Sequence, residues 1–338
     1  MTVPSGLLSR PPEESARLLA LSYLDDDAAA RPRLEDPEDD EALHDFRVAL
    51  RRLRSCLRAY KPYLARGVPK RLSRRLRRLA RSTGAGRDAE VQIEWLRPAG
   101  KSLGSYHRLG LAWLLDRLEE RNREAQRALR ERVGRDFADC AGELRRCLSV
   151  YRAEVHLGGE RRPVFAEATA DVLGELAEDL GDRLAGIGGA GDEKPAHRAR
   201  ISAKRVRYLL DPLAGEVPRA APLVQRLKGL QDILGELHDA HVLETELGEA
   251  VAEAAALRAR RLFAASLADA DGDGDKTLRA VRRRNHEPGI LVLARLNRQR
   301  RDRRFAELES AWLNGRADDF LAELSDFSEA LRSAGGTD

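Results

Sequence analysis

A line of basic side chains runs along the stretch from His44 to Lys61 and could bind an anion. Its members are spaced by three or four residues, which places them on one face of an α-helix: His44, Arg47, Arg51, Arg54, Arg58 and Lys61. Arginine can bind two oxygens of a phosphate or carboxylate at once. Because like charges at this spacing repel one another, the pattern predicts an anionic ligand along the helix.

The helix that carries this basic line also has an apolar line that should face a core. Its members repeat at the same spacing, about 100° around the helix axis: Phe46, Leu50, Leu53, Leu57 and Tyr60. A second helix, expected at residues 69–82, repeats the design with Lys70, Arg74, Arg77 and Arg81. Fourteen Lys or Arg residues and a single acid, Asp45, lie between Leu43 and Arg81. The two helices are therefore expected to face one basic groove.

The same arrangement occurs a second time in the chain. Its basic positions match those of the first copy one by one: His197, Arg200, Lys204, Arg205 and Arg207 stand for His44, Arg47, Arg51, Arg52 and Arg54. Downstream, residues 76–91 align without a gap to residues 227–242, with Lys228 at the place of Arg77 and His238 at the place of Arg87. This internal duplication predicts two half-domains related by pseudo-symmetry.

The paired His-x2-Arg-x3-basic-Arg-x-Arg motifs, each followed by a Gly-x3-Asp segment, resemble the CHAD domain, the conserved-histidine α-helical domain. The resemblance covers roughly residues 10 to 330. It implies an all-α fold in which two pseudo-symmetric four-helix-bundle halves surround a basic groove or pore. It also implies inorganic polyphosphate as the ligand, a non-catalytic role and an association with polyphosphate granules.

Composition agrees with a folded, all-α protein. Hydrophobic residues make up 42% of the 338 residues and aromatic residues 5%, and β-branched runs are few. Three widely spaced cysteines favour a reducing compartment, and no run of eighteen apolar residues suggests a membrane span. The expected location is the cytoplasm, with no membrane contact, no metal and no cofactor.

The expected organisation follows the duplication. Residues 1–11 and 332–338 should be disordered tails, residues 12–155 the first helical half, residues 156–196 a connecting segment with an acidic helix, and residues 197–331 the remainder of the second half. The acidic helix, from Glu167 to Leu184, is expected to face outward. Separate helices are expected at 108–133 and 136–152, and Gly235 is expected to interrupt the helix that begins near Pro222.

The two repeated histidines have two interpretations. Each either caps or packs at the start of its helix, or donates a hydrogen bond to phosphate. Next to arginines, an imidazole tends to be neutral without ligand and protonated when phosphate binds. The second interpretation therefore makes His44 and His197 pH-sensitive contacts.

Two alternatives to polyphosphate binding are open from the residues alone, and one further string resembles part of a calcium-binding loop. A nucleic-acid-binding protein would use the same basic helices, although the basic lines lack the aromatic rings that stack on bases. The His-Asp dipeptides at His44 and His238, with His241 one turn later, resemble ligands of a metal-dependent phosphohydrolase. The string from Asp269 to Asp275 matches the first half of a calcium-binding loop, but Ala280 stands where a glutamate is needed.

The polyphosphate interpretation predicts one set of binding residues. They are His44, Arg47, Arg51, Arg52, Arg54, Arg58, Lys61, Arg74, Arg77, Arg81, Arg87, His197, Arg200, Lys204, Arg205, Arg207, Lys228 and His238. The second half is less basic than the first, since Gln225, Gly229 and Asp232 replace Arg74, Arg78 and Arg81. Binding by the two halves is therefore expected to be unequal.

Overall fold

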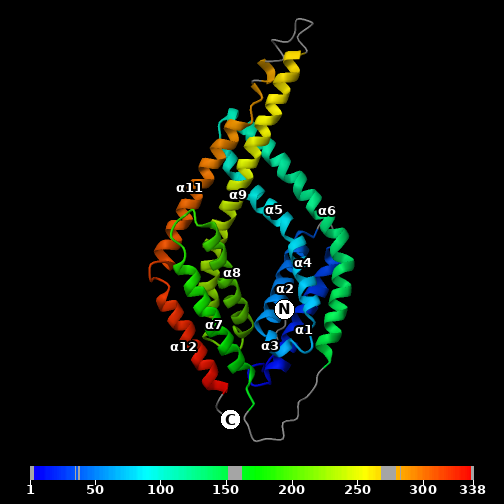
Figure 1. Ribbon diagram of the computed structural model, residues 1–338, viewed down its shortest axis with the longest axis vertical. Helices are drawn as coiled ribbons and strands as arrows, with labels where there is room; N and C mark the ends of the chain where they lie inside the picture. The colour runs from blue at the N-terminus through cyan, green and yellow to red at the C-terminus, as the bar shows by residue number, and fades with distance from the viewer. Residues whose placement is uncertain are drawn as a thin grey trace. The chain divides into compact units, whose positions relative to one another are not determined.

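The computed structural model describes residues 4–34, 36, 39–150, 162–267, 279–281 and 283–335, without the side chains of residues 40, 85 and 130–135. The described residues form helices and turns and no strand, which confirms the all-α prediction (Figure 1). The elements are α1 (Pro12–Arg33), α2 (Asp40–Ala59), α3 (Lys61–Leu64), α4 (Lys70–Ser82), α5 (Gly84–Ala99), η1 (Gly100–Ser102), α6 (Ser105–Ser149), α7 (Phe165–Ala185), α8 (Glu193–Leu210), η2 (Asp211–Leu213), α9 (Ala220–Leu267), α11 (Glu287–Trp312) and α12 (Asp318–Gly335). No described helix combines the length and apolar character needed to cross a membrane.

The chain divides into two compact units. Unit 1 consists of Met1–Gly84, Arg127–Leu234 and Leu308–Asp338, and unit 2 of Ala85–Gln126 and Gly235–Glu307. Each unit takes segments from both predicted halves, and the long helices α6 and α9 contribute to both units.

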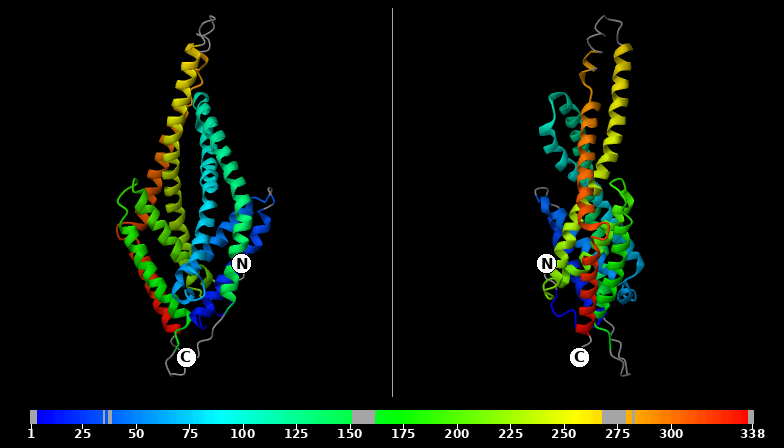
Figure 2. Two further views of the ribbon diagram at one scale, coloured as in Figure 1. Left: turned by 45° about the vertical axis from the view of Figure 1, so that its right-hand side comes forward. Right: turned by 90° about the vertical axis from the view of Figure 1, so that its left-hand side faces the viewer.

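The core of unit 1 is built from the apolar faces that the sequence predicts. Helix α2 packs against α1, α4 and α8, and α7 packs against α8 and α12, the last pair lying side by side in Figure 2. Phe46 of α2 is fully buried and meets Phe137 of α6 edge to face, with ring centroids 5.0 Å apart. Burying one such side chain contributes about 1.5–3 kcal/mol. The apolar face of α2 therefore holds this helix firmly in place.

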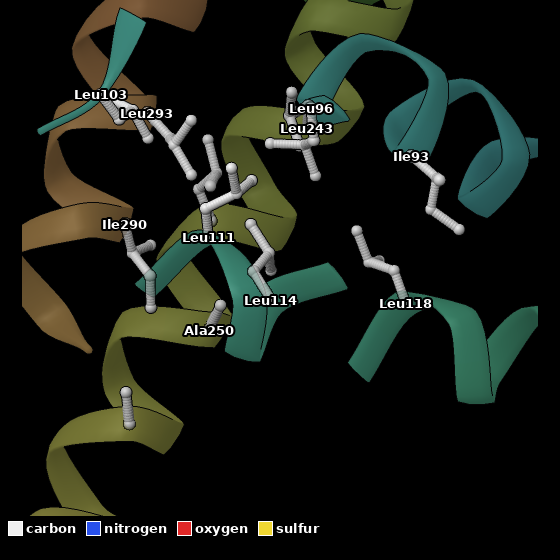
Figure 3. Packing of buried hydrophobic residues seen from close by; sticks show 12 residues of the cluster. Ile93, Leu96, Leu103, Leu111, Leu114, Leu118, Leu243, Ala250, Ile290 and Leu293 are labelled. Atoms are coloured by element: carbon white, nitrogen blue, oxygen red, sulfur yellow. The ribbon is translucent and has the colours of Figure 1, made fainter. Parts of the chain in front are cut away.

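Unit 2 has a separate aliphatic core, shown in Figure 3. Most of its members come from α5, α6, α9 and α11, among them Leu96, Leu114, Leu243 and Leu293. An ionic cluster adds to the contact between α6 and α9: the carboxylate of Glu246, 6% exposed, pairs with both Arg117 and Arg121.

Two predicted breaks between helices are wrong. Helix α6 runs without interruption through the break expected between residues 133 and 136, and α9 continues through Gly235. A glycine inside a helix costs only about 1 kcal/mol relative to alanine. The buried neighbours of Gly235, Leu234 and Leu237, offset that cost.

Candidate functional site

Both motif helices begin four residues before their histidine. Helix α2 starts at Asp40 and α8 at Glu193, so His44 and His197 each lie one turn inside their helices. An aspartate stands at the N-cap in both cases, five residues before the histidine. The carboxylate of Asp39 accepts a hydrogen bond from the backbone N–H of Ala42 at 2.9 Å, which caps α2. The duplication therefore extends to the residues that start each helix.

The two motif helices of unit 1 pack against each other and share a cavity of about 620 Å³. Five of the predicted binding residues line it: Arg51, Arg54 and Arg58 of α2 with Lys204 and Arg205 of α8. A hydrogen bond of 3.1 Å from Nη1 of Arg51 to the hydroxyl of Tyr208 links the two helices. The guanidinium of Arg207 lies 4.7 Å from the Tyr208 ring centroid.

Arg54 lies at the centre of a group of positive charges. Its pKa is lowered by burial and by the nearby guanidinium groups of Arg77, Arg51, Arg58 and Arg81. Because Arg77 and Arg81 belong to α4, the basic lines of α2 and α4 come together as predicted. The pKa of Arg205 is lowered in the same way, first by burial and then by Arg58 of the other motif helix.

Helix α4 has two basic faces that differ in their partners. On one face, Arg71 pairs with Glu143 of α6, and Arg75 lies 3.8 Å from Asp139. On the other face, Arg74, Arg77 and Arg81 have no ion-pair partner in the part of the chain that the structure describes. The same holds for Arg54 and Arg58 of the cavity. Positive charge therefore stays uncompensated on the sides of α2 and α4 that approach each other.

Three other predicted residues, Arg52, Arg207 and Lys228, lie near the carboxyl group of Asp211. Asp211 follows α8 and is largely buried, and burial raises its pKa although Arg207, Arg52 and Lys228 lower it. The carboxylate of Asp211 lies 3.9 Å from Nη1 of Arg207. The sequence analysis missed this acid, which lies close to these three cations.

The remaining predicted residues of unit 1 differ in exposure. His44, Lys61 and Arg74 are exposed, while Arg47 is half-buried and donates to the backbone carbonyl of Thr83 at 2.9 Å. Lys61 does not continue the motif helix as expected, because α2 ends at Ala59 and Lys61 begins α3.

His197 and Arg200 of α8 are both half-buried. The pKa of His197 is lowered by burial and then by Arg200 and Lys204, while Glu193 acts in the opposite direction. This agrees with the prediction of an imidazole that is neutral in the absence of a ligand.

Arg87 and His238 belong to unit 2, in α5 and α9. Arg87 is exposed and His238 half-buried. Their part in binding stays a prediction. The two His-Asp dipeptides are likewise divided between the units, and Asp45 pairs with Arg33 at 2.6 Å. The calcium-like string from Asp269 to Asp275 lies outside the described residues.

The sequence model of the CHAD domain matches residues 19–248. The chain belongs to the CHAD domain family. Its fold is similar to that in the crystal structure of the CHAD domain from the plant Ricinus communis, with a TM-score of 0.62 and 18% sequence identity over 96% of this chain and 94% of that chain. It is also similar to PptA from Streptomyces chartreusis, with a TM-score of 0.55 and 19% identity over 89% of this chain and 99% of that chain. No curated protein sequence matches the chain.

The cavity of this CHAD domain protein also has an acidic wall, which the sequence analysis missed. Glu175 and Asp179 of α7 line the cavity, so the expectation that the acidic helix faces outward is wrong for these two residues. Burial would raise the pKa of Asp179, but Ser202, Arg183 and Arg205 together lower it. Two acids against five cations leave the cavity with a net charge of about +3. The spacing of four residues places both acids on one face of α7, but only the packing of α7 on α8 shows which face that is.

Proposed function

We propose that this CHAD domain protein binds inorganic polyphosphate, with part of the polymer in the cavity between α2, α7 and α8 of unit 1. One observation carries the proposal: Arg54 and Arg58 line the cavity without an ion-pair partner among the described residues. Elsewhere in the same unit, comparable arginines such as Arg71 are paired with acids. The cavity volume falls within the range of about 300–1,000 Å³ that is usual for ligand sites.

The proposal assigns a shared role to all predicted basic residues. The cavity residues hold the polymer most closely, Arg77 and Arg81 extend the basic surface along α4, and Arg200 and His197 extend it along α8. The other proposed contacts are His44, Arg47, Arg52, Lys61, Arg74, Arg87, Arg207, Lys228 and His238. Two pseudo-symmetric halves around a groove, and an association with polyphosphate granules in the cytoplasm, are part of the same proposal. The role proposed for the protein is binding without catalysis.

The physical source of affinity is the release of counterions from the polyanion. Each phosphate that a cation neutralises frees condensed counterions, so affinity falls as salt rises. A nucleic acid would gain from the same effect, but it would also need rings for stacking. The aromatic residues that line the cavity, Tyr60 and Tyr208, are 2% and 7% exposed and offer no open ring face. This favours polyphosphate over a single-stranded nucleic acid.

Calorimetric titration with long-chain polyphosphate at two salt concentrations tests the proposal. We expect the double variant Arg54→Gln/Arg58→Gln to weaken binding strongly and to reduce the salt slope by about 1.4, using about 0.7 for each lost cation as for single-stranded nucleic acids. The matched control is Arg71→Gln/Arg75→Gln, which removes the same charge from the paired face of α4.

Two results would argue against the proposal. An equal loss of affinity in both double variants would mean that net charge alone attracts the polymer. Displacement of polyphosphate by RNA at equal phosphate concentration would instead support the nucleic-acid alternative.

A further inference from the structure

Unit 2 contains a second basic cavity, whose lining residues differ from those of the proposed polyphosphate site. It has a volume of about 240 Å³ and lies between α9 and the segment that leads into α11. From α9 it is lined by Ala254, Leu257, Arg258 and Arg261, which share one helical face. From the following segment it is lined by Ala280, Val281, Arg284 and His286.

Three arginines converge on this cavity, and among the described residues one carboxylate pairs with them. Arg258 lies 3.3 Å from the carboxylate of Glu287, and its Nε atom is buried without a hydrogen-bond partner. Arg261 and Arg284 have no ion-pair partner within the described ranges. Among the described residues, three guanidinium groups and one carboxylate leave a local charge of about +2, apart from His286.

Size and charge together limit the class of ligand. The cavity is smaller than the range of about 300 Å³ and above that suits drug-sized molecules. A phosphate group carries a charge of about −1.5 to −2 at neutral pH and offers several strong acceptor oxygens. Arginine forks match such oxygens in bidentate fashion. A simple carboxylate would leave about one positive charge uncompensated.

We infer that this cavity of unit 2 is a binding site for a small phosphate anion, held by Arg258, Arg261 and Arg284. The side chains of Ala254, Leu257, Ala280, Val281 and His286 form the rest of the wall and restrict the space to a compact ion.

An aromatic pair provides a local reporter for this site. The ring of His286, which lines the cavity, stacks on Trp113 with centroids 5.6 Å apart and an interplanar angle of 15°. The chain has three tryptophans, so a fluorine label on each indole gives three signals. The Trp113 signal is identified by its loss in the Trp113→Phe variant.

The experiment titrates the full chain with inorganic phosphate at constant ionic strength and follows the fluorine spectrum. We expect a saturable shift of the Trp113 signal, and an affinity about 100-fold weaker in Arg261→Gln/Arg284→Gln, because each of the two lost charge-assisted hydrogen bonds amounts to about one factor of ten. Arg54→Gln/Arg58→Gln should titrate like the unaltered protein. The circular dichroism of each variant verifies that it is folded.

Three results would overturn this site. They are a Trp113 signal that does not respond to phosphate, an equal response to acetate, and an unchanged affinity in Arg261→Gln/Arg284→Gln. Loss of the response in Arg54→Gln/Arg58→Gln would place phosphate in unit 1 and overturn it as well. Because the Trp113 signal reports on unit 2, a negative result in this titration would not contradict polyphosphate binding in unit 1. Likewise, a negative result for polyphosphate binding would not contradict the phosphate site in unit 2.

Discussion

Asp27 places a carboxyl group at a position of α1 where the sequence pattern predicts an apolar side chain. It lies on the core face of α1 with an exposed fraction of 0%, and neither carboxyl oxygen has a hydrogen-bond partner. Burial, followed by the negative charge of Asp26, raises the pKa of Asp27 to about 8. The folded protein therefore keeps Asp27 protonated at neutral pH, whereas the unfolded chain ionises it near pH 4.

This difference predicts a pH dependence of stability. Between about pH 4 and 8 the folded state holds one proton more than the unfolded state, so stability falls by about 1.4 kcal/mol per pH unit as pH rises. Above about pH 8 this contribution levels off. Asp27→Asn should remove the slope and stabilise the protein at pH 7.5, by about 5 kcal/mol at most if both pKa values hold.

Urea unfolding at a series of pH values from 5 to 8.5 measures this effect. The matched control is Asp25→Asn, because Asp25 is on the same helix but its side chain is 61% exposed. An Asp27→Asn curve parallel to that of the unaltered protein would contradict the assigned protonation state.

His197 should make polyphosphate binding depend on pH. Its lowered pKa means that the imidazole is neutral before binding, with Arg200 and Lys204 opposing its charge. A polyphosphate at the same place would favour the protonated form, so binding should take up a proton and tighten as pH falls from 8 to 6. Calorimetry in buffers of different ionisation enthalpy measures the uptake. His197→Gln should abolish it, and an unchanged uptake would exclude this histidine.

At the scale of elements, two glycines set how closely α6 and α11 approach in unit 2. A Cβ atom at Gly110 would lie 2.2 Å from the carbonyl oxygen of His286 and 2.9 Å from the Cα of Gly289. Backbone atoms cannot move aside as a flexible side chain can. The two helices can therefore keep this distance only with glycine at the contact.

Gly110→Ala should accordingly destabilise unit 2 by about 1–3 kcal/mol or more. Gly142→Ala is the matched control in the same helix, because nothing lies within 4 Å of its added Cβ. That change should stabilise the protein by up to about 1 kcal/mol through helix propensity. Thermal unfolding of the two variants should give shifts of opposite sign, and similar shifts would show that α6 and α11 can separate at no cost.

The helices were predictable because each buries one apolar face, and the helical spacing of the apolar residues on that face can be recognised in the sequence. The periodicity of α2 and α4 also placed Arg54 and Arg77 on faces that could meet. The ends of helices were harder to predict: α9 continues through Gly235 because the buried residues on both sides hold it. A local signal such as one glycine cannot show how strongly tertiary packing opposes it.

The acids near the site were not predictable for a similar reason. Glu175 and Asp179 lie on a helix that looks solvated in sequence, and Asp211 follows a helix end. Their effect on Arg205 and Arg207 depends on contacts between segments that are distant in the chain or on the turn that follows α8. Sequence patterns identify the cations, but only packing shows which of them are neutralised.

At the scale of the whole molecule, the net charge of +4 conceals a strong segregation of charge. The two faces of α4 illustrate it, since one is paired with acids of α6 and the other is not. Electrostatic attraction of a polyanion depends on such local fields rather than on the sum. The division into two units then determines which part of the molecule a ligand stabilises.

Hydrogen exchange with and without polyphosphate tests that division. A ligand at 100 times its dissociation constant stabilises the state that binds it by about 2.7 kcal/mol, which slows exchange through opening of that state about 100-fold. If polyphosphate binds in unit 1, amides of α2, α4 and α8 should slow, whereas those around Leu243 and Leu247 in the core of unit 2 should not. Because α9 belongs to both units, the change should fall within this single helix, near Leu234 and Gly235. Uniform slowing along the whole of α9 would instead mean that the two units open together as one cooperative structure.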